Sequence, residues 1–359
     1  MLPAKSRREF LGLGLAGGML AGGLGFAGGA WARGGASAGG GLVAAGAAAT
    51  AGGEPAAGAV ATGGGQPATA LDSRGTAAAA GTLVIGGDLT VNRLGFGAMR
   101  ITGDGIWGEP ADPKEAFAVL RRALELGTNF IDTADAYGPY VSEQLIREAL
   151  YPYPRGLLIA TKGGQVRPRR EEWVADGRPE HLRAACEASL TRLKLDRIDL
   201  YQLHRPDPEV PFEDSVGELA KLQKEGKIRH IGLSNVNVGQ LAQARGIVKI
   251  VSVQNRYNVA DRSSDDVLAV CEREQIAFIP WGPLAQRPQE TASPSKQLTA
   301  LQAVAKARNI DIEEAALAWS LARSPVMLPI PGTSKVAHLE DNVGAAKIKL
   351  TAQEMAQVG

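Results

Sequence analysis

From residue 83 onward, short apolar runs rich in β-branched residues alternate with longer segments in which apolar residues recur every three or four positions. Short apolar runs predict buried strands, and the longer periodic segments predict amphipathic helices. Strands are expected at 94–99, 130–132, 157–161, 198–203, 230–233, 250–254, 277–281 and 326–330. Helices are expected at 113–126, 142–150, 179–193, 212–225, 265–274, 298–308 and 312–323.

The order of these elements predicts the fold class. Asp112-Pro113 and Arg178-Pro179 are good helix starts, because proline at the first helical position loses no needed hydrogen bond. Alternating strands and helices imply parallel strands joined by crossover helices, and eight such units predict an α/β fold, the closed (β/α)8 TIM barrel. An open doubly wound sheet is the alternative. It is disfavoured because polar groups follow nearly every strand, whereas an open sheet gathers its ligand groups near one switch point.

The first 80 residues differ from the rest. Arg7-Arg8 precedes an uncharged, glycine-rich stretch that ends in Ala30-Trp31-Ala32, a small-x-small sequence typical of a cleavage site. Residues 1–32 resemble a twin-arginine (Tat) signal peptide, which implies a periplasmic or exported protein that meets the membrane only transiently. A nonfunctional signal would leave the protein cytoplasmic. A retained membrane anchor is the other alternative, disfavoured by the many glycines.

Two further features of the N-terminal region bear on its role. Residues 12–17 match the dinucleotide-binding pattern GxGxxG, but the preceding strand and following helix that this motif requires are missing, so no cofactor is expected there. Residues 33–80 are mostly alanine, glycine and threonine, which predicts a disordered low-complexity linker. The barrel is therefore expected to occupy residues 81–359.

Composition and charge narrow the classes of partner. The chain has 39 lysines and arginines against 38 aspartates and glutamates, so its net charge of +1 gives no case for nucleic-acid binding and favours a small-molecule partner. Cys186 and Cys271 show neither CxxC spacing nor a neighbouring histidine pair, so no metal site is expected. Both are expected to be reduced and buried, with a single long-range disulfide as the alternative.

Polar side chains follow three of the apolar runs. Asp132 and Tyr137 lie at the end of the second run, Lys162 ends the third, and His204 ends the fourth. Because all strand ends of a barrel face the same mouth, these four residues are expected to form one site. Each also has a structural alternative: a turn-capping aspartate, a half-buried tyrosine, a solvated lysine and a hydrogen-bonded histidine.

The four side chains suit carbonyl reduction. Tyrosine, with an ordinary pKa of about 10, donates a proton near neutrality only where a cation or second donor stabilises its phenolate. Lys162 is the candidate cation, Asp132 would hold Lys162 by an ion pair, and His204 would orient the substrate oxygen. Carbonyl reduction needs such a general acid at the oxygen while hydride arrives at the carbon.

Residues 83–359 resemble the aldo-keto reductase superfamily. The resemblance lies in segments at 95–99, 130–138, 160–163, 199–204, 226–235, 253–255 and 330–333, which occur in family order. It implies an NADP(H)-dependent reductase of aldehydes or ketones with Tyr137 as general acid. It also implies that Lys162 and Asp132 lower the pKa of Tyr137 and that His204 orients the substrate.

The resemblance also implies where the cofactor binds. Residues after the later strands would contact the nicotinamide, phosphates and adenine: Ser234, Asn235, Gln254, Trp281, Gly282, Leu284, Gly332, Thr333, Ser334, Lys335, His338, Asp341 and Asn342. Trp281 would stack on the nicotinamide, or instead pack at the barrel rim. His338 stands where many NADP-dependent members carry arginine, so Lys335 would supply most of the charge for a 2′-phosphate. NADP is expected, with NAD as the alternative.

Trp107, in the segment 105–108, is expected to wall the substrate pocket. Together with 135–139 and 280–284, this segment resembles the bacterial branch that includes pyridoxal reductases, which implies reduction of pyridoxal to pyridoxine. A reductase of some other aldehyde or ketone is the alternative. A non-enzymatic nucleotide-binding barrel, acting as a sensor or accessory subunit like potassium-channel β subunits, is disfavoured because all four catalytic positions are filled.

Overall fold

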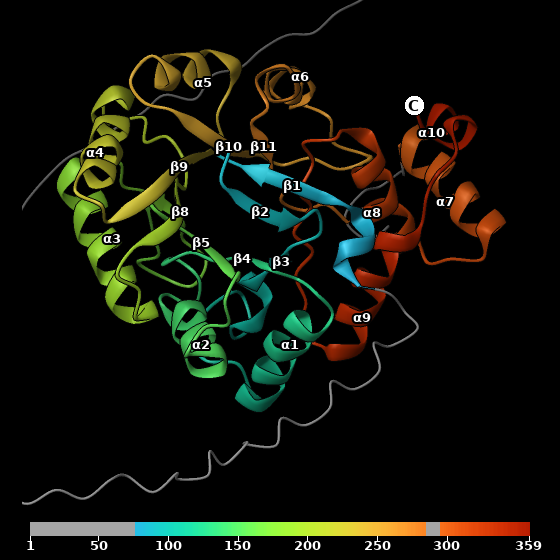
Figure 1. Ribbon diagram of the computed structural model, residues 1–359, viewed down its shortest axis with the longest axis horizontal. Helices are drawn as coiled ribbons and strands as arrows, with labels where there is room; N and C mark the ends of the chain where they lie inside the picture. The colour runs from blue at the N-terminus through green and yellow to red at the C-terminus, as the bar shows by residue number, and fades with distance from the viewer. Residues whose placement is uncertain (1–75, 285–294) are drawn as a thin grey trace, which may run out of the picture. The chain divides into compact units, whose positions relative to one another are not determined.

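The computed structural model describes residues 76–284 and 295–359, in which a ring of helices surrounds a curled parallel sheet (Figure 1). Seven strands follow one another in the order β11-β10-β9-β8-β5-β4-β3, and every neighbouring pair is parallel. The strands are β3 (Phe96–Gly97), β4 (Phe130–Asp132), β5 (Leu158–Gly163), β8 (Ile198–Leu203), β9 (Ile228–Ser234), β10 (Ile250–Gln254) and β11 (Ala277–Phe278).

An extended segment, residues 326–331, closes the ring between β11 and β3. Leu328 N–H donates to the Phe278 carbonyl at 2.8 Å, and Gly95 N–H donates to the Pro329 carbonyl at 3.0 Å. The sequence predicted a regular strand at 326–330, but the structure has this irregular segment there. Pro329 and Pro331 have no N–H and cannot complete a strand's hydrogen bonds. The sheet therefore has the closed arrangement of a TIM barrel, with one irregular member.

Helices cover the outside of the sheet all the way around (Figure 1). They are α1 (Pro113–Glu125), α2 (Val141–Leu150), α3 (Pro179–Leu193), α4 (Phe212–Lys224), α5 (Val238–Arg245), α6 (Asp265–Glu274), α7 (Lys296–Arg308), α8 (Ile312–Arg323), α9 (Val336–Gly344) and α10 (Ala352–Val358). The seven expected helices are confirmed to within about two residues at each end, which is the usual uncertainty of a helix boundary. Asp112 caps α1 by accepting from Lys114 N–H and Glu115 N–H.

Two other expected strands are shorter than the apolar runs that predicted them. Of 94–99, only Phe96–Gly97 is a strand, and the run continues as the 3-10 helix η2 (Ala98–Ile101), whose Ala98 and Ile101 are buried. Burial alone does not distinguish a strand from another buried conformation. Of 277–281, only Ala277–Phe278 is a strand, because Pro280 lacks the N–H that a regular pair requires.

Two hairpins were not predicted. β1 (Thr82–Ile85) pairs with β2 (Leu89–Asn92), and β6 (Gln165–Val166) pairs with β7 (Val174–Ala175). Ile85 and Val91 of the first hairpin pack in one cluster with side chains of the barrel strands, including Phe130 and Leu200. Figure 1 shows β1 and β2 lying across the middle of the ring. The β1–β2 hairpin therefore covers one end of the barrel.

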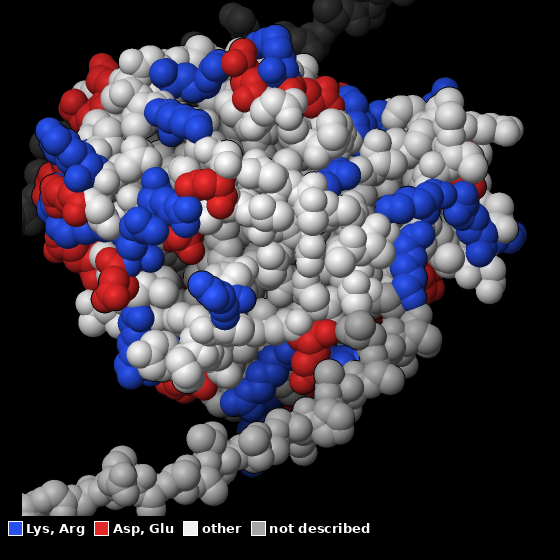
Figure 2. All heavy atoms as spheres, viewed as in Figure 1, with Lys and Arg blue, Asp and Glu red and all other residues white. Residues whose placement is uncertain are grey.

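Charged side chains lie mainly at the rim of this covered face. Figure 2 shows lysine and arginine interspersed with aspartate and glutamate around a central area without charge. A mixed distribution of this kind creates no extended field of one sign on this face.

The expected export signal at 1–32 and nearly all of the linker at 33–80 lie outside the described residues. The last part of the expected linker forms the 3-10 helix η1 (Ala77–Ala80), with Ala77 and Ala80 buried. Across residues 76–284 and 295–359, the helices are all too short or too polar to cross a bilayer. Cys186 and Cys271 are free and buried, as expected.

Candidate active site

A buried ion pair lies at the ends of β4 and β5. The ammonium of Lys162 is 2.6 Å from one carboxylate oxygen of Asp132, and it also donates to the Thr133 carbonyl at 2.9 Å. Lys162 is 0% exposed and Asp132 is 2% exposed. The Lys162 ammonium lies 3.3 Å from the Tyr137 hydroxyl. The structure thus brings together the three residues that the sequence placed at two strand ends.

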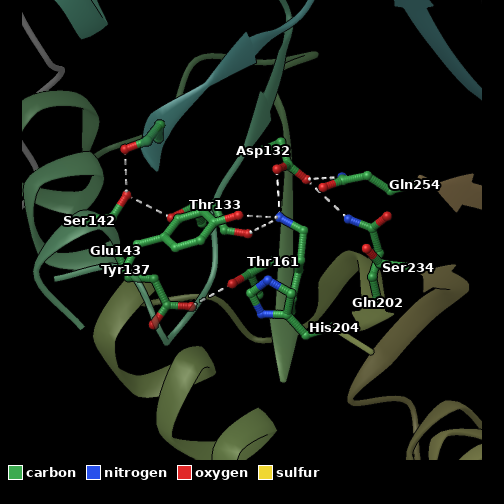
Figure 3. Close-up of polar contacts among 12 residues, drawn as sticks. Asp132, Thr133, Tyr137, Ser142, Glu143, Thr161, Gln202, His204, Ser234 and Gln254 are labelled. Atoms are coloured by element: carbon green, nitrogen blue, oxygen red, sulfur yellow. Dashed lines mark hydrogen bonds and ion pairs between the residues drawn. The ribbon is translucent and has the colours of Figure 1, made fainter. Parts of the chain in front are cut away.

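Two glutamines hold the other oxygen of Asp132. The amide of Gln202, on β8, donates to it at 3.0 Å, and the amide of Gln254, on β10, donates to it at 2.9 Å. In Figure 3 both glutamines approach Asp132 from the side away from Tyr137. Gly232 of β9 leaves room for the Gln202 side chain, because a Cβ at Gly232 would lie 2.9 Å from Cγ of Gln202. The carboxylate is therefore fixed by donors from three strands.

The pKa of Tyr137 corrects one expectation. Burial raises the pKa of Tyr137 above its ordinary value, the nearby positive charge of Lys162 lowers it, and the negative charge of Asp132 raises it. Asp132 was expected to help lower this pKa, but its direct effect is the opposite. Burial lowers the pKa of Lys162, yet Asp132 and Tyr137 more than offset burial, so its pKa is raised and Lys162 stays charged. Tyr137 is thus a protonated donor beside a fixed cation.

His204, at the end of β8, faces the tyrosine. The ring centres of Tyr137 and His204 are 5.8 Å apart, and the rings meet at 83°. Burial and the positive charges of Lys162 and Arg205 hold the pKa of His204 well below its usual range. The imidazole is therefore neutral near neutral pH and can donate one N–H to a substrate oxygen.

Asn235, directly after β9, connects His204 to the expected nicotinamide contacts. It adopts φ +59°, a left-handed conformation that asparagine tolerates. Its amide donates to the His204 carbonyl at 3.0 Å and to the Ser234 hydroxyl at 3.0 Å. The indole N–H of Trp281 donates to the side-chain amide oxygen of Asn235 at 3.1 Å. Ser234, Asn235, Gln254 and Trp281 thus gather at neighbouring strand ends.

The expected phosphate site lies at the start of α9. Thr333 is buried and its hydroxyl accepts from Lys335 N–H at 3.1 Å, whereas Ser334, Lys335 and His338 are exposed. Gly332 passes so close to Gly97 that a Cβ would lie 2.5 Å from the Gly97 carbonyl. The nine-residue helix α9 begins directly after Lys335 and the Thr333 hydroxyl, a setting that suits a phosphate, and Val336 N–H in its first turn donates to the Glu115 carboxylate at 3.3 Å.

The remaining expected cofactor residues are spread around this region. Asn342 of α9 is buried and Asp341 is exposed, while Gly282 and Leu284 follow Trp281 at the edge of the described chain. No three or more His, Cys, Asp or Glu side chains come together as a possible metal site within the described part of the chain.

Sequence reasoning missed three residues at this end of the barrel. Gln202 supports Asp132, Trp173 meets the Tyr137 ring edge-on at 6.4 Å between centres, and Arg167 lies against Trp173 and Trp107. A signal existed for Gln202. It lies two positions before His204 in a mainly apolar run, and residues two apart in a strand share a face.

Comparisons with known proteins agree with this geometry. Residues 93–359 match the Aldo/keto reductase family. The chain is 43% identical over 272 residues to the pyridoxine 4-dehydrogenase of Escherichia coli, covering 74% of this chain and 93% of that protein. It is 52% identical over 290 residues to an uncharacterized oxidoreductase of Schizosaccharomyces pombe, covering 81% of this chain and 92% of that protein.

Solved structures also resemble the fold. The glycerol dehydrogenase from Gluconobacter oxydans superposes with a TM-score of 0.69 at 26% identity, over 78% of this chain and 94% of that chain. An aldo-keto reductase from Klebsiella pneumoniae in complex with NADPH superposes with a TM-score of 0.64 at 26% identity, over 77% of this chain and 93% of that chain.

Proposed function

Because the chain belongs to the aldo/keto reductase family, a family of oxidoreductases, we propose that it reduces an aldehyde or ketone to an alcohol with NADPH. The observation that carries the proposal is the contact of one buried ammonium, Lys162, with both the Tyr137 hydroxyl and the Asp132 carboxylate. A solvated lysine or a merely packed tyrosine would not need such a contact. The arrangement supplies a proton donor whose anion is stabilised in advance.

The protein's own residues handle the proton and orient the substrate. The Tyr137 hydroxyl donates its proton to the carbonyl oxygen, which leaves a phenolate beside the Lys162 ammonium. Asp132, held by two glutamine amides, keeps that ammonium in place. Neutral His204 donates its N–H to the same carbonyl oxygen and thereby orients the substrate carbonyl. Bound NADPH supplies the hydride that the carbonyl carbon receives.

The proposed cofactor is NADP rather than NAD. One structure of an aldo-keto reductase from Klebsiella pneumoniae is in complex with NADPH, and a second structure of an aldo/keto reductase from that organism is in complex with NADP and acetate. In this chain, exposed Lys335, directly before α9, and exposed His338, in its first turn, would meet the 2′-phosphate. Replacing Lys335 by alanine should lower kcat/KM for NADPH relative to that for NADH. Replacing His338 by arginine should raise kcat/KM for NADPH relative to that for NADH. Unchanged ratios of kcat/KM for the two nucleotides would contradict this placement.

The proposed substrate is pyridoxal, reduced to pyridoxine. The support is the 43% identity to a pyridoxine 4-dehydrogenase over 93% of that protein's length. The test is NADPH consumption with pyridoxal, with the product identified by chromatography against a pyridoxine standard. If the protein reduces other aldehydes but not pyridoxal, the proposed reductase activity stands and pyridoxal is rejected as its substrate. NADPH binding without reduction of any aldehyde would favour a nucleotide-binding accessory protein.

We also propose that the chain is exported through a twin-arginine signal. The support is Arg7-Arg8 followed by the uncharged stretch that ends in Ala30-Trp31-Ala32. The test is fractionation of cells that express the full chain, with sequencing of the mature N-terminus. A new N-terminus near Arg33 in the periplasm is expected, and an intact chain found only in the cytoplasm would contradict export.

A further inference from the structure

Arg167 lies between two tryptophans at the catalytic end of the barrel. It follows β6, and its guanidinium carbon is 3.8 Å from the ring centre of Trp173 and 5.4 Å from that of Trp107. The side chain is only 6% exposed. A guanidinium over an indole face is attracted by the negative charge of that face, most strongly where water is excluded. Arg167 therefore contacts both aromatic side chains directly.

The guanidinium also joins two segments of backbone. Nη1 donates to the Ile106 carbonyl at 3.0 Å, and Nη2 donates to the Gly105 carbonyl at 3.2 Å and to the Arg170 carbonyl. Among the described residues, no carboxylate lies within ion-pair distance of it. The planar fork of arginine can hold several carbonyls in fixed directions, which lysine cannot do. Arg167 thus connects the loop after β3 to the hairpin of β6 and β7.

The loop that Arg167 holds has an unusual backbone. Ile106 adopts φ +59°, a left-handed conformation that is costly for a β-branched residue. Its carbonyl accepts both the Arg167 bond and a bond from Gly138 N–H at 3.3 Å. Gly108 N–H returns a bond to the Gly138 carbonyl at 2.6 Å. These bonds keep Trp107 against Gly138, the residue that follows Tyr137.

The other tryptophan meets the general acid directly. Trp173 approaches Tyr137 edge-on, with ring centres 6.4 Å apart and an interplanar angle of 72°. Trp107, Arg167, Trp173, Tyr137 and His204 thus form a continuous row of ring and guanidinium contacts. Trp107 and Trp173 are each partly exposed. Partly exposed indole surface of Trp173 therefore lies beside the Tyr137 ring, and Trp107 pairs with Gly138, the next residue.

We propose that Arg167 is a positioning residue that holds Trp107 and Trp173 as an aromatic wall of the substrate pocket, and that this wall selects planar aromatic aldehydes over small aliphatic ones. The inference rests on the proposed carbonyl reduction and names the substrate class. A flat ring can stack on or meet an indole with a favourable geometry that a short alkyl chain lacks. Arg167 itself need not touch the substrate.

The test compares Arg167→Met with wild type on nitrobenzaldehyde and on propanal. The KM for nitrobenzaldehyde should rise about tenfold and its kcat should stay within about threefold, whereas both constants for propanal should change less than about twofold. Arg169→Met is the matched control, because the Arg169 side chain is 82% exposed and two residues away. The control should leave both substrates unaffected.

Two further variants keep the test decisive. Arg167→Lys keeps the charge without the fork and should resemble Arg167→Met. Trp173→Leu removes one wall and leaves Arg167 in place, so it should raise the KM for nitrobenzaldehyde selectively even if Arg167→Met folds poorly. The proposed aromatic wall would be contradicted if both Arg167→Met and Trp173→Leu lost the same factor in kcat/KM for the aromatic and the aliphatic aldehyde. It would also be contradicted if neither variant changed these constants. If wild type reduces neither of these aldehydes nor pyridoxal, the proposed function fails instead.

Discussion

The two ends of the barrel are closed by opposite kinds of side chain. At one end the β1–β2 hairpin inserts Ile85 and Val91 among apolar side chains of the strands. At the other end the strands bury a charged pair, Asp132 and Lys162. Burying apolar surface stabilises a fold directly, whereas each buried charge has a desolvation cost that only good partners offset. The hairpin end thus contributes stability, whereas the charged pair at the other end depends on its hydrogen-bond partners to offset the cost of its burial.

The two ends also differ in how deeply their polar contacts are buried. At the hairpin end they stay near the rim, where the partly exposed carboxylate of Asp88 contacts the His230 ring nitrogen at 2.6 Å and Arg229 at 2.7 Å. At the catalytic end the polar contacts are buried (Figure 3). Substitutions at the first end should therefore change stability alone. Those at the second should change activity as well.

The largest effect is expected from Lys162→Met. The variant leaves Asp132 buried without its cation, which should lower the free energy of unfolding by about 3–5 kcal/mol and nearly abolish reduction. Urea unfolding and NADPH consumption measure the two effects. The control is Asp132→Leu with Lys162→Met, which removes both charges. It should recover most of the stability and none of the activity, and recovery of activity would refute the role of Lys162.

Ile85→Ala should have the next largest effect, and on stability alone. Ile85 is 1% exposed in the apolar cluster, so its truncation should lower the free energy of unfolding by about 2–4 kcal/mol. The variant should keep wild-type kcat and KM below its unfolding transition. Val84→Ala is the neighbouring control, because Val84 is 48% exposed and should change stability little. A changed kcat in Ile85→Ala would show that the two ends are coupled.

Gln202→Leu should affect catalysis more than stability. The substitution removes one of the two amide donors to Asp132, and it also removes the Gln202 carbonyl oxygen, a buried atom with no hydrogen-bond partner among the described residues. The two effects on stability oppose each other, so the free energy of unfolding should change by less than about 1.5 kcal/mol. The value of kcat should fall about tenfold, with the affinity for NADPH unchanged. An unaltered kcat would show that Gln254 alone positions the carboxylate.

The smallest effect is expected from Asp88→Asn. Hydrogen bonding to His230 and Arg229 lowers the pKa of Asp88, so its contribution to stability is present above its ordinary pKa and is lost as pH falls through the lowered value. Since Asp88 is nearly half exposed, the contribution should stay under about 1 kcal/mol. Unfolding of wild type and variant should therefore differ slightly above about pH 4 and converge in stronger acid. A difference that persists or grows in acid would contradict this origin.

The residues that the sequence predicted well carry local signals. Asp132, Lys162 and His204 each end an apolar run, and the closure of the strands into a barrel brings such ends together. The helices follow from their periodicity, and Asp112 and Pro113 mark the start of α1. The fold and the gathering of these residues at one end of the barrel were therefore accessible from the pattern of apolar and polar positions.

What could not be predicted depends on contacts between distant segments. Gln202 meets Asp132 across 70 positions. Whether the pKa of Tyr137 is raised or lowered depends on how completely the barrel buries this side chain. The segment 326–331 is apolar like a strand, but its prolines prevent regular pairing. Burial and partners of this kind become known only when the chain is folded.

The most direct test of the account is the single-turnover rate of NADPH oxidation by pyridoxal in wild type and in Tyr137→Phe near neutral pH. NADPH affinity is measured in parallel by fluorescence titration. The substitution removes only the hydroxyl 3.3 Å from the Lys162 ammonium. It should slow hydride transfer by about 10²–10⁴-fold and leave the affinity for NADPH unchanged. Equal rates in the two proteins would contradict the role of Tyr137 as the proton donor.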